Sequence, residues 1–153
     1  MILEYYSMPH AKHKPVRANP SDAGLDLKYN PDVGSQPVSI EPGQSMILGT
    51  GLKFGVPHGY MIQIMNRSGN AAKKKLMVGA CVVDSGYNGE VFVNLHNIGS
   101  KPQTINPGDK IAQAVVIPVV PARFVETSND NLYEWAPITI SDRGAGALGS
   151  TGR

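Results

Sequence analysis

The sequence predicts an all-β protein, and three features of its composition support this. The chain has 153 residues, of which 17 are glycine and 12 are proline, the residues that most often interrupt helices. Valine and isoleucine number 14 and 11 against 9 leucines, and β-branched side chains favour pleated strands. The hydrophobic fraction of 41% excludes disorder caused by low hydrophobicity, and the length suits a single core. We therefore expect one domain built from β-strands.

Short apolar runs separated by turn residues predict the strands in chain order. Pro-Gly turns at 41–44 and 106–109 each lead into a run, because proline presets φ for a turn and glycine accepts the positive φ after it. Helical spacing is expected over residues 68–76, with Ser68 as the cap and the lysines at 73–75 on a solvated face. The expected strands are residues 2–6, 25–29, 45–49, 60–65, 91–96 and 110–120.

Charge and composition also limit the possible partners. The formal net charge is only +2, so we expect no nucleic-acid partner and no membrane-surface helix. No apolar stretch is long enough to span a bilayer, and the N-terminal residues do not resemble a secretory signal. Cys81 is the single cysteine, and the four histidines lack metal-site spacing, so a structural role is expected for them. We expect a cytoplasmic protein.

The last thirteen residues differ in composition from the rest. They contain four glycines and almost nothing apolar, so they cannot bury enough surface to order themselves. We therefore divide the chain into a β-barrel domain, residues 1–140, and a flexible arm, residues 141–153. Arg143 and the stretch 149–152 nevertheless carry an arginine fork, backbone amides and hydroxyls that suit a phosphate chain. The alternative, which the composition alone favours, is a disordered terminus.

Two internal segments carry residues suited to chemistry. Asp84 and Tyr87 follow an apolar run and precede an alternating strand, which predicts a β-hairpin with both side chains near its tip. The aspartate is either a turn-forming residue or a general base at the edge of a pocket. Arg67, Ser68 and Gly69 lie where a strand meets the short helix, where they would either bind phosphate oxygens or serve as a cap and a surface ion pair.

Taken in order, five segments resemble the motifs of the homotrimeric dUTP diphosphatase (dUTPase) family. Together they extend along nearly the whole chain, and five motifs in the right order are far more specific than any one. They are Ala-Gly-Leu-Asp-Leu at 23–27, Arg-Ser-Gly at 67–69 with Ala-Ala-Lys at 71–73, the run 78–89 around Asp84 and Tyr87, Gly-Asp-Lys-Ile-Ala-Gln at 108–113, and the run 143–152.

The resemblance implies a fold, an assembly and a reaction. The fold would be a compact, distorted jelly-roll β-barrel, and three copies would form a homotrimer with active sites shared between subunits. The glycine-rich C-terminal arm would close each site as a lid ordered by ligand. The implied reaction is hydrolysis of dUTP to dUMP and pyrophosphate.

The resemblance also implies roles for individual residues. Asp84 would activate the attacking water, and Tyr87 would exclude a ribose 2′-hydroxyl by a steric clash. Mg²⁺ would be held mainly by the substrate phosphates, with Asp26 touching its hydration shell through water. The remaining substrate-binding residues would be Cys81, Val82 and Val83 for uracil, Arg67, Ser68, Gly69, Gln113 and Arg143 for the phosphates, and Leu148, Gly149 and Ser150 in the lid.

Three positions depart from the family pattern. Leu148 stands where the fifth motif usually has phenylalanine, so the lid can cover uracil but not stack on it. Cys81 replaces a usual glycine, and Gly86 stands where an acid is common. Two alternatives remain open: a deoxycytidine triphosphate deaminase of the same fold, which would need a glutamate at the pyrimidine ring, and a non-catalytic trimeric nucleotide sensor.

Overall fold

The protein was analysed as a computed structural model that describes residues 1–34, 36–128, 130 and 132–137. In this described part the fold is all-β, as expected, with eleven strands and one short helical segment. The chain divides into two units, Met1–Pro121 and Ala122–Arg153. The expected boundary after residue 140 lies outside the described residues. The strands are β1 Glu4–Ser7, β2 Gly24–Lys28, β3 Val38–Ile40, β4 Ser45–Gly49, β5 Leu52–Gly55, β6 Tyr60–Met65, β7 Leu76–Val78, β8 Val82–Val83, β9 Phe92–Asn97, β10 Gln103–Ile105 and β11 Lys110–Pro118.

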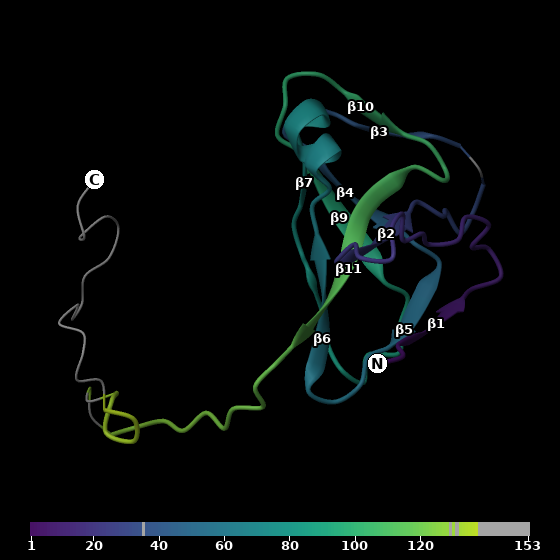
Figure 1. Ribbon diagram of the computed structural model, residues 1–153. Helices are drawn as coiled ribbons and strands as arrows, with labels where there is room; N and C mark the ends of the chain where they lie inside the picture. Colours follow the sequence, from purple (N-terminus) through teal and green to yellow (C-terminus); the bar gives the residue numbers. More distant parts are fainter. Residues whose placement is uncertain (35, 129, 131, 138–153) are drawn as a thin grey trace. The chain divides into compact units, whose positions relative to one another are not determined.

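All strand pairs are antiparallel, and most join strands that are distant in sequence. One sheet has the order β2-β11-β6-β8, a second has the order β4-β9-β7, and β1–β5 and β3–β10 form two-stranded pairs. The long strand β11 pairs with β2 on one side and β6 on the other (Figure 1). Gln113 of β11 is the partner of Asp26 on one side and of Met65 on the other, so the residues after β6 lie near Asp26.

The alternating patterns place the core as expected. Ile62 and Ile64 of β6 are buried, and so are Val93 and Leu95 of β9, whereas Phe92 at the start of β9 is half exposed. The core is therefore built from the inward faces of the two larger sheets, as the period of two residues requires.

The helical segment begins where expected but ends two residues early. Ser68 and Gly69 are helical and lead into a π-helical turn over Asn70–Lys74, labelled η1. The N-cap position of η1 is Gly69, with no side-chain cap hydrogen bond, so the expected cap at Ser68 is wrong. Lys75 takes a left-handed conformation with φ of 57°, which turns the chain into β7. The buried side chain of Leu76 belongs to that strand, because packing in the core outweighs the helical spacing.

The expected β-hairpin around Asp84 is also wrong. β8 pairs with β6, whereas β9 pairs with β4 and β7, so the two strands lie in different sheets and do not pair with each other. Residues 84–90 therefore form a connection between two sheets, which we call the third-motif loop. Gly86 takes a φ of +85° within it, a conformation that favours glycine.

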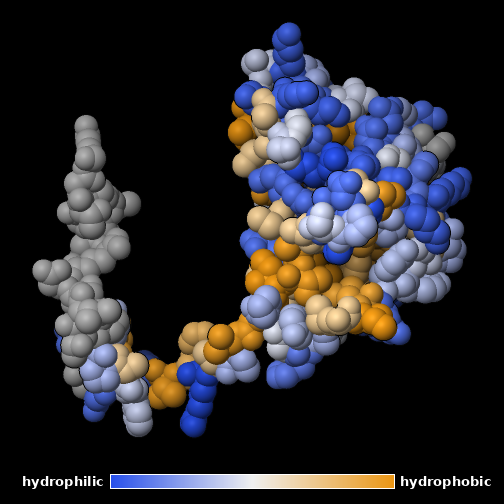
Figure 2. Space-filling model, viewed as in Figure 1, coloured by the Kyte–Doolittle hydropathy of each residue, from blue (hydrophilic) through white to orange (hydrophobic). Residues whose placement is uncertain are grey.

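The first unit carries an exposed apolar surface. Figure 2 shows apolar side chains gathered on the part of this unit formed by the N-terminal segment, β6 and β11. A groove of about 580 Å³ lies there, and its apolar lining includes Leu3, Leu25, Phe54, Ile62 and Val116. Within the described residues, no helix is long and apolar enough to cross a membrane.

Candidate active site

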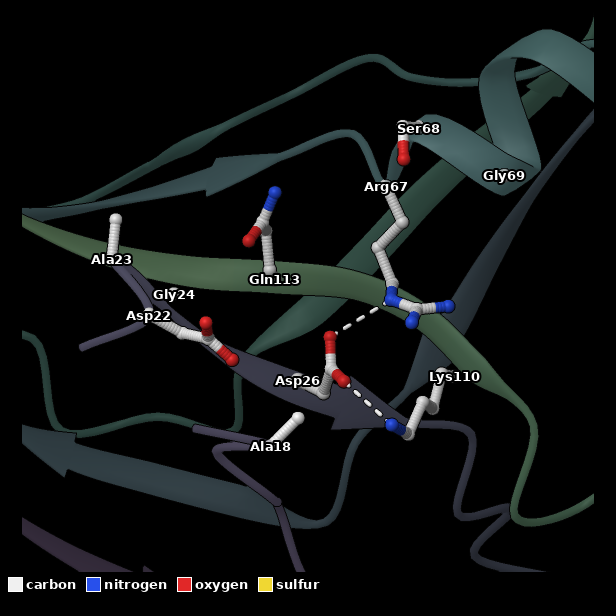
Figure 3. A pocket seen from close by; sticks show the side chains of 10 residues that line it. All are labelled: Ala18, Asp22, Ala23, Gly24, Asp26, Arg67, Ser68, Gly69, Lys110 and Gln113. Atoms are coloured by element: carbon white, nitrogen blue, oxygen red, sulfur yellow. Dashed lines mark hydrogen bonds and ion pairs between the residues drawn. The ribbon is translucent and has the colours of Figure 1, made fainter. Parts of the chain in front are cut away.

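One pocket of the first unit gathers residues from the first, second and fourth motifs. It has a volume of about 520 Å³ and contains three of the segments that the sequence analysis singled out (Figure 3). Lys110 also lies in it, although it was assigned no role from the sequence. The lining residues are Ala18, Asp22, Ala23, Gly24, Asp26, Arg67, Ser68, Gly69, Lys110 and Gln113. We call this the cationic pocket.

Asp26 holds the two cations of this pocket in place. Its Oδ1 accepts from Arg67 Nε and its Oδ2 from Lys110 Nζ, each at 2.8 Å (Figure 3). The Asp26 side chain is only 14% exposed, whereas the two cations are about one-third exposed. A single carboxylate thus orients two positive groups at the pocket surface, leaving the other guanidinium nitrogens of Arg67 to face a ligand. Such an arrangement suits a polyanion such as a triphosphate.

A bulge in β11 explains why Lys110 belongs to this pocket. In strict alternation Lys110 and Gln113 would lie on opposite faces, because they are three residues apart. The pairing of β11 with β2 instead shifts register between Lys110 and Ala112, and Ile111 and Ala112 are both buried. The extra residue turns Lys110 onto the face of Gln113. Asn70 Nδ2 donates to the carbonyls of Lys110 and Ile111, at 3.0 and 3.3 Å, which satisfies the bulge.

Gln113 is held over a glycine that leaves room for it. Its Nε2 donates to the carbonyl of Asn66 at 2.9 Å, which connects β11 to the chain just before Arg67. A Cβ on Gly24 would overlap Gln113 Oε1. The glycine of the first motif therefore accommodates the glutamine of the fourth motif.

The charges around Asp26 make a pH-dependent contribution to stability. Burial raises the pKa of Asp26, but hydrogen bonds from Lys110 and Arg67, together with their charges, outweigh burial and lower it below 3.8. A lowered folded-state pKa means that the stabilisation is present above the unfolded-state value and is lost as the pH falls through the folded-state value.

We expect Asp26→Asn to lower the free energy of unfolding at pH 7 by about 1.5–3 kcal/mol, the range for hydrogen bonds to charged groups. The difference in free energy of unfolding between Asp26→Asn and wild type should shrink as the pH falls below about 3.8. Urea unfolding at a series of pH values measures both effects, with the exposed Asp32→Asn as control. A difference that is constant down to pH 2 would contradict this assignment.

A second pocket gathers the third motif. Its volume is about 380 Å³, which falls in the range of small-molecule sites, and Asp84 and Tyr87 line it. Tyr87 Oη donates to the carbonyl of Glu90 at 2.9 Å, and Asp84 is exposed at the rim. Glu90 and Phe92 also line this pocket, and the sequence motifs gave neither a site role. The lining residues are Ile64, Ala80, Cys81, Val82, Val83, Asp84, Tyr87, Glu90, Val91 and Phe92. We call this the nucleoside pocket, after the ligand that the resemblance to the dUTPase family implies for it.

The backbone of β8 offers hydrogen-bonding groups to this pocket. Val82 and Val83 pair with β6 on one side, and the Cys81 carbonyl accepts from Ile64 N at 2.7 Å. Within the described residues β8 is the last strand of its sheet, so its other edge presents unpaired N–H and C=O groups. A planar ring with its own donors and acceptors can pair with such an edge.

The structure therefore brings the predicted site residues into two groups. Asp26, Arg67, Ser68, Gly69 and Gln113 share the cationic pocket, and Cys81, Val82, Val83, Asp84 and Tyr87 share the nucleoside pocket. The two pockets have no lining residue in common. Arg143, Leu148, Gly149 and Ser150 lie outside the described residues.

The described residues do not form a ready-made magnesium cage. Among them, no three His, Cys, Asp or Glu side chains gather as metal ligands. Both oxygens of Asp26, the expected partner of the hydrated ion, already accept from cations. The donor set of the cationic pocket therefore fits an anion better than a bare divalent cation.

A β-fold that presents a cationic pocket and a separate pocket with an exposed carboxylate defines a candidate nucleotide-binding protein. A profile of the dUTPase family matches residues 10–152, so the chain belongs to the dUTPase family. A deoxyuridine 5′-triphosphate nucleotidohydrolase of Gloeobacter violaceus is 40% identical over 147 residues, which cover 95% of this chain and 92% of the relative. One from Dinoroseobacter shibae is 43% identical over 143 residues, 91% of this chain and 87% of the relative.

Solved structures show the same fold. The dUTPase of Staphylococcus bacteriophage 80alpha, in a single-residue variant with dUpNHpp, superposes with a TM-score of 0.82 at 21% identity over 99% of both chains. A single-residue variant of the dUTPase from phage phi11 of S. aureus gives 0.75 at 22% identity, over 86% of this chain and 99% of that chain, and that structure is described as showing coordination of a structural Mg(II) ion. The expected jelly-roll β-fold is confirmed.

Proposed function

We propose that this protein hydrolyses dUTP to dUMP and pyrophosphate. The observation that carries the proposal is the sorting of the motif residues into a cationic pocket and a nucleoside pocket, which match the two chemically different parts of a nucleoside triphosphate. Family membership and the names of the relatives support the substrate.

Asp84 is the general base in this proposal. Its carboxylate takes a proton from a water molecule, and the oxygen of that water attacks the α-phosphorus. The bond from the α-phosphorus to its bridging oxygen breaks, and pyrophosphate leaves with the electron pair. The exposed position of Asp84 at the pocket rim supports this role, because a general base must be accessible to water and substrate.

The nucleoside pocket selects the base and the sugar. The free edge of β8 next to Cys81 pairs with the edge of uracil, as an added strand would. The Tyr87 ring packs against the deoxyribose, so that a 2′-hydroxyl would collide with it. The hydrogen bond from Tyr87 to the Glu90 carbonyl supports a fixed ring position.

The cationic pocket binds the phosphates. Arg67 and Lys110 neutralise the charge that develops on the leaving pyrophosphate, and Gln113 and Ser68 add polar contacts. Mg²⁺ bound to the triphosphate would shield part of its negative charge, and the cations of this pocket would neutralise the remainder. Arg143, Leu148, Gly149 and Ser150 belong to the arm that covers the site in this proposal.

Three copies of the chain form the active unit, with the cationic pocket of one subunit facing the nucleoside pocket of another. The separation of the two pockets within one chain supports this arrangement. So does the apolar groove of the first unit, since a groove of that size needs a partner to cover it. Large apolar side chains in residues 122–137, including Phe124 at 95% and Trp135 at 86% exposure, provide further surface for subunit contacts.

The direct test is pyrophosphate release from dUTP, UTP, dTTP and dCTP with Mg²⁺, with ammonia release followed in parallel. We expect pyrophosphate from dUTP, and a preference of at least about a hundredfold over UTP, in the range that a steric block supplies. Ammonia from dCTP without pyrophosphate from dUTP would instead identify a deaminase. Nucleotide binding without turnover would identify a sensor.

Removing residues 141–153 is expected to lower kcat/KM for dUTP about tenfold to a hundredfold, the equivalent of one lost charge-assisted contact from Arg143. The oligomeric state should not change, because the described strands and the apolar groove remain. Size-exclusion chromatography and the pyrophosphate assay measure the two effects, with Arg143→Ala in the full chain as a comparison. A truncated protein with wild-type activity would show that the arm is not a lid.

A further inference from the structure

Glu90 connects the third-motif loop to a neighbouring segment of the core. Its side chain is only 13% exposed, and its Oε1 accepts from the backbone N–H of Gly51 at 2.7 Å. Its backbone carbonyl accepts the Tyr87 hydroxyl at 2.9 Å. One residue thus holds the core with its side chain and the tyrosine with its main chain.

The anchor on the core side leaves little freedom for the carboxylate. Gly51 is buried, and its N–H is the donor that Glu90 satisfies. His10 Nε2 lies 3.8 Å from Glu90 Oε1 and is itself buried without a hydrogen bond. A Cβ on Gly49 would lie 2.8 Å from the same Oε1 atom, so the carboxylate fills the space that this glycine leaves.

The next residue reinforces the connection. Val91 N donates to the Leu52 carbonyl at 2.8 Å, and Thr50 Oγ1 donates to the Val91 carbonyl at 2.6 Å. Together with the Glu90 side chain, these bonds tie residues 90–91 to residues 50–52. These hydrogen bonds end at Val91, one residue before β9, so the core sets the position of the Glu90 carbonyl.

The tyrosine depends on that position. A Cβ on Gly89 would overlap the Oη and Cζ atoms of Tyr87, so the ring lies directly over this glycine. Tyr87 is 47% exposed, and the hydrogen bond to Glu90 fixes the hydroxyl end of the ring. A shift of the Glu90 carbonyl would therefore move the ring.

We infer that Glu90 is a positioning residue that sets the discrimination between deoxyribose and ribose by fixing Tyr87 through its own main chain. This inference rests on the proposed function, in which Tyr87 excludes the 2′-hydroxyl. It assigns Glu90, which lines the nucleoside pocket, a role in specificity that acts through Tyr87 and not through contact with the reacting atoms.

The test compares kcat/KM for dUTP and UTP in wild type, Glu90→Ala, Glu90→Gln and Tyr87→Phe. Glu90→Ala should lower the dUTP-to-UTP ratio about tenfold, the equivalent of one hydrogen bond, and Tyr87→Phe should lower it similarly. Glu90→Gln keeps an acceptor oxygen for Gly51 N–H and should stay within about twofold of wild type. The double variant Glu90→Ala/Tyr87→Phe should be no less selective than Tyr87→Phe alone. Both substitutions disrupt the same hydrogen-bonded connection between Tyr87 and the core, so their effects should not add.

Two further variants separate positioning from general destabilisation. Gly49→Ala displaces the Glu90 carboxylate while leaving the sequence of the third-motif loop unchanged, and it should lower the same ratio. This variant also tests the inference if Glu90→Ala does not fold. Glu41→Ala, at an exposed turn, should leave the ratio unchanged. Folded Glu90→Ala or Gly49→Ala protein with the wild-type ratio would overturn the inference while the proposed function stands. A wild-type protein with no preference for dUTP would overturn both.

Discussion

Asp84→Asn is expected to lower the turnover of dUTP by about a hundredfold to ten-thousandfold, the range that a general base contributes. An amide has nearly the same shape as a carboxylate but cannot accept the proton of the attacking water. Asp84 is exposed in the loop, so the substitution should leave the fold intact. Pyrophosphate release measures turnover, and calorimetric titration with dUpNHpp measures whether nucleotide binding persists.

Two controls make this result specific. Asp32→Asn changes an exposed aspartate that lines neither the cationic nor the nucleoside pocket, and its turnover should match wild type. The thermal midpoint of Asp84→Asn should also match wild type, since the exposed side chain is not part of the core. Wild-type turnover in Asp84→Asn would overturn the general-base assignment, and loss of both binding and turnover would assign Asp84 to substrate binding instead.

The longer strands could be predicted from the sequence because their alternation reflects burial on one face. β4 and β6 have the expected bounds, and Ile62 and Ile64 are buried as their spacing predicted. The pairs β1–β5 and β3–β10 involve strands of three or four residues. So short a strand carries little periodic signal and depends on its partner, which explains why β3, β5 and β10 were missed.

The errors at the site have the same physical origin. The hairpin expected around Asp84 required β8 and β9 to pair, but which strands pair is decided by tertiary packing that local turn chemistry does not encode. Lys110 was missed because a one-residue bulge reverses the face on which it lies. The roles of Asp84, Tyr87 and Arg67 came from their motifs, and the structure adds which of them share a pocket.

Mixing two inactive variants is expected to restore activity if the site is shared between subunits. Arg67→Ala disables the cationic pocket and Asp84→Asn disables the nucleoside pocket, so each homotrimer should be inactive. In trimers reassembled at random from equal amounts, the subunit that supplies Arg67 to a site has an intact Arg67 half of the time, and the subunit that supplies Asp84 has an intact Asp84 half of the time. About a quarter of the sites should therefore combine an intact Arg67 from one subunit with an intact Asp84 from another. Activity should therefore rise to about a quarter of the wild-type value.

The outcome distinguishes the two possible geometries of the site. If both pockets of one chain served the same substrate, every site in the mixture would carry one defect, and reassembly would restore nothing. The double variant Arg67→Ala/Asp84→Asn mixed equally with wild type is the matched control. Its activity should fall from about half to about a quarter of the all-wild-type value on reassembly if sites are shared, and stay at about half if they are not. Native mass spectrometry of the mixture verifies that subunits have exchanged. Exchanged trimers without restored activity would contradict a site shared between subunits, because the two pockets would then have to act from one chain.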